Sequence, residues 1–161
     1  MIKLAKLCAI VLLIGIGQSP AQERADSIAG AEIITPIMIM AWEELEFGTI
    51  APDAMAPGTV VLSPAGQRIC DTNLTCLSTY RAGKFSVTGE VNALYTISLP
   101  NSVTLESGQH SMQMEAVLPS HAAGILIDGY DEFMVGATLR VGANQSTGAY
   151  IGDYVVTVEY Q

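Results

Sequence analysis

The sequence predicts an all-β fold, a two-sheet antiparallel sandwich that follows an N-terminal signal peptide. After the signal, no long stretch shows helical periodicity, and short runs rich in Val, Ile, Thr, Tyr and Phe alternate with polar residues. Turn residues separate these runs, and no interval between them is long enough for a crossover helix. Only 14% of the residues are charged and 50% are hydrophobic, so the chain can bury a core.

Eight runs are predicted as strands, and they are residues 34–42, 44–50, 59–63, 84–89, 94–100, 110–118, 132–143 and 150–160. The first is apolar on both faces and is therefore expected to be a central strand. In the middle of the chain, alternation predicts these inward side chains: Phe85, Val87, Tyr95, Ile97, Leu99, Met112, Met114 and Ala116.

The N-terminus has the pattern of an export signal. Lys3 and Lys6 precede an apolar run, residues 7–16, and small residues at Ser19 and Ala21 predict cleavage after Ala21. The run is shorter than the roughly 20 residues that a spanning helix needs, so an uncleaved anchor is the weaker alternative. We therefore predict a signal peptide at residues 1–21, an N-terminal arm at 22–33, a sandwich at 34–161, and a location in the periplasm, at the cell surface or outside the cell.

The charge excludes several partners. After residue 21 the basic residues are outnumbered by sixteen Asp and Glu, and the basic set is Arg24, Arg68, Arg81, Lys84 and Arg140. Nucleic acids and anionic membrane surfaces attract a positive surface, so neither is an expected partner.

Two cysteines, Cys70 and Cys76, remain after the signal, inside a polar stretch at 67–83 that is predicted to be the longest loop. Two nearby cysteines in an oxidising compartment predict a disulfide. A metal pair and a reactive thiol are the alternatives, but zinc normally needs four ligands and no second Cys or His pair is present.

The sequence gives no reason to expect an enzyme, a cofactor or a bound metal. The histidines are His110 and His121, and no G-x-S-x-G motif occurs. Ser120 adjoins His121, but neighbours on a strand point to opposite faces, which argues against a catalytic triad.

Two acidic clusters stand out. The first is Glu43, Glu44 and Glu46, of which we expect Glu43 and Glu44 to face solvent, and the second is Asp128, Asp131 and Glu132. The second could bind calcium, but it lacks a spaced D-x-D-x-D-G pattern, and Asp128-Gly129 is typical of a hairpin turn.

Three segments resemble the bacterial domain of unknown function 4402 family. The first has L-x-F-G at Leu45, Phe47 and Gly48, the second is KFSVTGEVNALYTISLP at residues 84–100, and the third runs from VGATL to the terminal V-T-V-x-Y within residues 133–160. The resemblance implies an exported immunoglobulin-like sandwich and no established activity.

The C-terminus is similar, more weakly, to chaperone–usher pilins of the spore coat protein U type. Tyr160 is penultimate, Gly148 is fourteenth from the end, and an alternating face lies between them, formed by Tyr154, Val156, Val158 and Tyr160. Such pilins lack one strand and receive it from the next subunit. The resemblance implies a C-terminal assembly strand, and the alternative is an ordinary last strand of a sandwich.

The leading hypothesis is therefore a structural subunit of a fibre or coat that assembles by β-strand addition. Its partners would be further copies of itself, or a periplasmic chaperone and an outer-membrane usher. The arm would be the donor, and the residues that could enter a neighbour are Ile28, Ala29, Ala31 and Ile33, in a register that the sequence leaves open. The alternative is a self-contained exported binding module for a carbohydrate or a protein.

Overall fold

The computed structural model describes residues 23–161, and the predicted signal peptide at 1–21 lies outside them. Residues 23–32 contain no helix or strand, and all of their side chains are exposed. Residues 33–161 form one compact unit. Among residues 23–161, no helix is long and apolar enough to cross a bilayer.

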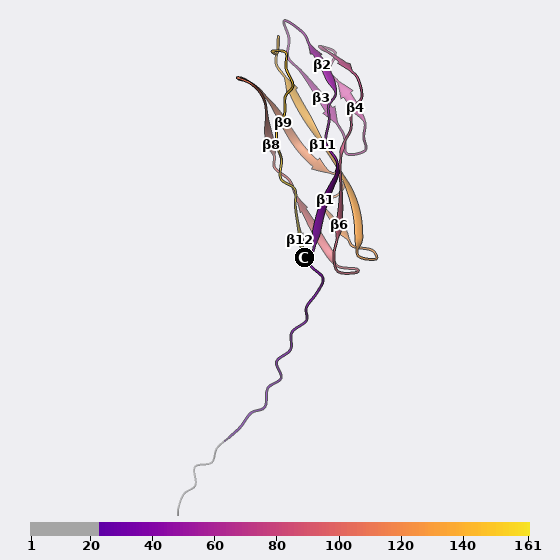
Figure 1. The fold of residues 1–161 in the computed structure, drawn as a ribbon, viewed down its shortest axis with the longest axis vertical. Helices are drawn as coiled ribbons and strands as arrows, with labels where there is room; N and C mark the ends of the chain where they lie inside the picture. The colour runs from indigo at the N-terminus through magenta and orange to yellow at the C-terminus, as the bar shows by residue number, and fades with distance from the viewer. Residues whose placement is uncertain (1–22) are drawn as a thin grey trace, which may run out of the picture. The chain divides into compact units, whose positions relative to one another are not determined.

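The unit is built from strands alone, as the alternating sequence pattern predicts (Figure 1). In chain order they are β1 (Met38–Glu43), β2 (Thr49–Pro52), β3 (Gly58–Leu62), β4 (Arg68–Cys70), β5 (Leu74–Leu77), β6 (Gly83–Thr88), β7 (Leu94–Ser98), β8 (Ser102–Ser107), β9 (His110–Pro119), β10 (Ala123–Ile125), β11 (Tyr130–Val141) and β12 (Thr157–Tyr160). All of their pairings are antiparallel.

The largest sheet has seven strands and is centred on β11. The first half of β11 pairs with β6, placing Phe133 opposite Phe85, and the second half pairs with β3 and β9. Strand β1 pairs with the outer edge of β6, β4 pairs with β3, and β8 pairs with β9. Figure 1 shows β1 and β6 beside each other below β3 and β9.

Two smaller sheets complete the sandwich. One has the order β10-β7-β12 and the other pairs β2 with β5. The inner side chains of β7, Tyr95 and Ile97, belong to the same core as those of the largest sheet. The other buried hydrophobic members of this core are Phe47, Val60, Leu62, Leu74, Phe85, Val87, Leu105, Met114, Val117, Leu126, Phe133, Val135, Ala137, Leu139 and Val141. Alternation therefore gave the correct inward face for β6 and β7.

The prediction that the first strand is central in its sheet is wrong. Strand β1 is an edge strand, because only β6 pairs with it. Its apolar side chains lie on two different faces: Ile39 packs against the core, whereas Met38, Met40 and Trp42 are at least 60% exposed. Apolar residues on both faces therefore do not mark a central strand here.

Two further expectations are corrected. The stretch at 67–83 is not one long loop, since it contains the two short strands β4 and β5. In β9, Ala116 is exposed with a φ of 47°, and Val117 takes the buried place instead. The register between β9 and β11 shifts at this position, so the side chains that follow Glu115 change the face on which they lie.

Cys70 and Cys76 form a disulfide, as predicted, with their Cα atoms 6.4 Å apart. Cys70 ends β4 and Cys76 lies in β5, so the bond joins the largest sheet to the β2–β5 sheet. Arg68 of β4 reinforces this junction, because its guanidinium donates to the carbonyl oxygens of Phe47 and Leu77 at 2.9 and 3.2 Å.

Removing the disulfide is expected to lower the free energy of unfolding by about 2 kcal/mol, because the closed loop is short. Urea unfolding of a Cys70→Ala, Cys76→Ala double variant measures this. The wild-type chain under reducing conditions is the matched control and should reach the same midpoint. A double variant as stable as the oxidised wild type would contradict the expectation.

Candidate functional site

A long groove opens between the first and last parts of the sandwich. Its volume is about 990 Å³. One wall is formed within residues 44–52, which follow β1 and include β2, and the other by residues 145–154, which precede β12. The floor consists of core side chains from β8, β9 and β11, namely Leu105, Met112, Met114, Leu139 and Val141. The groove therefore reaches the hydrophobic core from outside.

Backbone hydrogen bonds to neighbouring segments hold each wall of the groove. Glu46 exchanges two backbone hydrogen bonds with Arg81, and β2 pairs with β5. In the opposite wall, Ile151 exchanges two backbone hydrogen bonds with Glu106 of β8, and β12 pairs with β7. In the part of the chain that the structure describes, no strand pairs with both walls and fills the space between them.

Glycines let the second wall approach the sheet closely. A Cβ atom on Gly152 would lie 2.5 Å from the carbonyl oxygen of Thr104, and one on Gly148 would lie 2.2 Å from Ser107 Oγ. Gly148, singled out from the sequence, is thus a wall residue whose lack of a side chain allows the contact with β8.

Tyr154 reaches from the C-terminal wall toward β6. Its ring meets Phe85 edge-on with centroids 6.3 Å apart, and its hydroxyl lies over Gly83, where a Cβ would be 2.8 Å away. Burial, with a smaller contribution from the negative charge of Glu44, raises the pKa of Tyr154 to about 12. Tyr154 therefore belongs both to the groove and to the core beneath it.

The alternating C-terminal face is present as predicted, although only its last four residues are strand. Tyr154, Val156, Val158 and Tyr160 are half-buried against the core, whereas the side chains between them are exposed. The Tyr160 hydroxyl donates to the carbonyl oxygen of Thr35 at 2.7 Å and accepts from the amide of Glu90 at 2.6 Å. It thereby ties the C-terminus to the chain entering β1, a contact that no local sequence pattern signals.

The arm residues predicted to donate are all exposed. Ile28 is 99% and Ile33 97% exposed, and Ala29 and Ala31 are exposed as well. These side chains contribute nothing to the core of the domain, whose buried members all follow residue 46.

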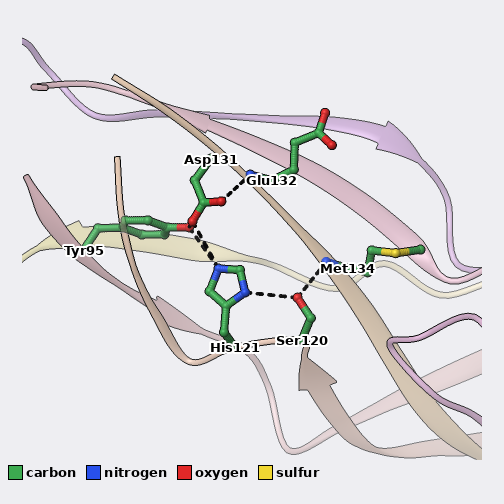
Figure 2. Close-up of polar contacts among 6 residues, drawn as sticks. All are labelled: Tyr95, Ser120, His121, Asp131, Glu132 and Met134. Atoms are coloured by element: carbon green, nitrogen blue, oxygen red, sulfur yellow. Dashed lines mark hydrogen bonds and ion pairs between the residues drawn. The ribbon is translucent and has the colours of Figure 1, made fainter. Parts of the chain in front are cut away.

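A second site, which is a network of polar side chains, joins the two layers of the sandwich (Figure 2). The fully buried Tyr95 of β7 donates to Asp131 Oδ2 of β11 at 2.8 Å. His121 Nε2 lies 3.3 Å from the same oxygen, and His121 Nδ1 lies 3.2 Å from Ser120 Oγ. Burial, and then the bond to Asp131, raise the pKa of Tyr95 above its usual range.

The prediction that Ser120 and His121 point to opposite faces is wrong. Both residues follow the end of β9, so strand alternation does not apply to them. In the resulting Ser–His–Asp chain, the nearby amide of Met134 donates to Ser120 Oγ, at 3.2 Å. We interpret the network as a structural link between β7, β11 and the β9–β10 connection.

The structure also shows where the two acidic clusters lie and what they contact. Both Glu43 and Glu46 form ion pairs with Arg81. Glu43 Oε2 lies 3.9 Å from Arg81 Nε, and Glu46 Oε2 lies 3.0 Å from Arg81 Nη2. Asp128 and Gly129 form the predicted turn, with φ values of 54° and 78°. In residues 23–161, no group of three His, Cys, Asp or Glu side chains is arranged to hold a metal ion.

The free energy of unfolding is expected to fall in alkaline solution, because the pKa values of Tyr95 and Tyr154 are raised in the folded state. A pKa that is raised in the folded state stabilises the fold below the unfolded pKa, near 10, and this contribution is lost as the pH rises through about 12 for Tyr154. Phenolate absorbance and chemical unfolding across this interval measure the effect. A Tyr154→Phe variant should lose less stability over the same interval, and an identical loss would contradict the assignment.

Residues 37–160 match the model of a protein family described as a domain of unknown function, DUF4402. The match includes both walls and the floor of the groove, the disulfide and the Tyr95 network. No curated protein matches the chain.

Proposed function

The chain belongs to the DUF4402 family, and we propose that this member is an exported structural subunit of a fibre or surface coat, assembling by β-strand addition. The observation that carries the proposal is the groove, because its floor is the hydrophobic core itself and its two walls are not paired with each other. An extended segment laid between the walls would cover Leu, Met and Val side chains and form main-chain hydrogen bonds.

The donor in this proposal is the arm of a second copy. Residues 22–33 precede β1, and the apolar members Ile28, Ala29, Ala31 and Ile33 are exposed where the structure describes them. Burial of apolar surface stabilises by about 25 cal/mol per Å², so filling the groove with these side chains favours association.

An open groove of this kind is an aggregation hazard before assembly. The proposed partners are therefore a periplasmic chaperone that covers the groove and an outer-membrane usher that exchanges the chaperone for the next subunit. The disulfide supports an oxidising compartment, as does the export signal predicted from the sequence. The proposed role is structural and involves no catalysis.

The test is a denaturing gel of protein purified from the periplasm or the cell surface. Without heating, we expect a ladder of multimers that collapses to a monomer on boiling. A variant lacking residues 22–30 should give only the monomer while keeping its β-sheet circular dichroism. A full-length chain that runs as a single monomer band, or a ladder that survives the deletion, would overturn the proposal.

A further inference from the structure

Trp42 sits at a β-bulge on the outer face of the largest sheet. Strand β1 pairs Ala41 with Phe85 and Glu43 with Lys84, so Trp42 is the extra residue between them. Bulges re-aim side chains and are over-represented at sheet edges and next to active sites. The side chain is 63% exposed, which is unusual for the largest apolar residue type.

The indole ring is nevertheless held in place. Its Nε1 donates to Ser86 Oγ on the adjacent strand β6 at 2.8 Å. Ser86 is polar but only 5% exposed. An aromatic ring that is fixed before binding loses little conformational entropy when a ligand stacks on it.

Polar side chains of β6 and β11, and a pocket that some of them line, follow next to the indole across the sheet. Ser86 lies opposite Glu132 of β11, and Glu132 forms an ion pair with Lys84 at 2.9 Å. The Tyr130 hydroxyl, and then Lys84, hold the pKa of Glu132 below its usual value, so the carboxylate is ionised. Lys84 and Glu132 also line a pocket of about 660 Å³ together with Ser120 and Met134.

We propose that Trp42 and this adjoining pocket bind a neutral carbohydrate. Charge selects the ligand class: Lys84 and Glu132 neutralise each other, so the site favours no net charge, while the net charge of −9 on the chain disfavours anions. A pyranose ring presents an apolar face that can stack on the indole. Its hydroxyls can accept from the Lys84 ammonium and donate to the Glu132 carboxylate.

The site is independent of strand addition, because it shares no residue with the groove. A fibre subunit could carry it on its outer surface, and so could a monomer. Failure of the sugar-binding test would therefore leave the proposed assembly untouched, and the reverse also holds.

Trp42 is the one tryptophan of the chain, so its fluorescence reports directly on the site. We expect maltotriose, cellotriose or chitotriose to change the emission saturably, with a Kd below about 10 mM. By calorimetry, Trp42→Ala should weaken binding at least about tenfold. Ser86→Ala, which frees the indole, should weaken binding less than Trp42→Ala does.

The matched control is Met55→Ala, because Met55 is apolar, 90% exposed and outside both the pocket and the indole contact. It should bind like the wild type, and all variants should keep the wild-type melting temperature. No saturable response to any of the three sugars would overturn the proposal, as would unchanged affinity in Trp42→Ala. Loss of self-association in Trp42→Ala without any sugar response would assign the surface to a protein contact instead.

Discussion

Replacing Ala29, Ala31 and Ile33 together with Asp is expected to abolish the heat-labile multimers and to leave the monomeric domain as stable as before. In the described chain these side chains are exposed, so a carboxylate there disturbs no packing. In the groove of a second copy, the same carboxylates would face core side chains such as Met114 and Leu139 without partners. Burial of an unpaired charge is strongly unfavourable.

Unheated denaturing gels and thermal unfolding measure the two effects separately. Ile28→Asp tests the other register, since Ile28 points to the opposite side from Ala29 in an extended segment. Whichever variant loses the multimers identifies the inward face. Met55→Asp, an equally exposed change outside the arm, is the control and should assemble normally. Multimers that persist in both arm variants would contradict insertion of this segment.

Phe133→Ala is expected to have the largest effect on stability, lowering the free energy of unfolding by about 3–5 kcal/mol. Phe133 is 1% exposed and stacks on Phe85 with ring centroids 5.3 Å apart. Its strand, β11, pairs with β3, β6 and β9, so a cavity at this point affects most of the largest sheet.

Urea unfolding followed by circular dichroism gives the value. Val91→Ala is the matched control, because Val91 is 55% exposed in the β6–β7 connection and should change stability little. If Phe133→Ala cost no more than Val91→Ala, the core as described would be wrong.

The sandwich could be predicted because period-two alternation is strong where only one face of a strand is buried. Strands β6 and β7 follow this rule, and Phe85, Val87, Tyr95 and Ile97 are buried as expected. The rule fails for β1, since apolar side chains on both faces predict a central strand but Met38, Met40 and Trp42 face outward. Periodicity describes which residues share a face and says nothing about what covers it.

The candidate site was less accessible to sequence reasoning. The walls of the groove come from opposite ends of the chain, and its floor comes from β8, β9 and β11, so no local pattern contains it. The disulfide could be predicted from the number and spacing of the cysteines, but not that it joins two short strands of different sheets. The contacts of Ser120 with His121, and of Tyr160 with Thr35, likewise depend on tertiary structure.

The most direct measurement for assembly by strand addition uses the arm as a separate peptide. A chain that begins at Ile34 should bind a synthetic peptide of residues 22–34 saturably in calorimetry, and the peptide should raise the melting temperature of that chain. A peptide with the three Asp substitutions, or with scrambled order, should do neither. A melting temperature that the native peptide leaves unchanged, or raises no more than the scrambled peptide does, would contradict the proposed function.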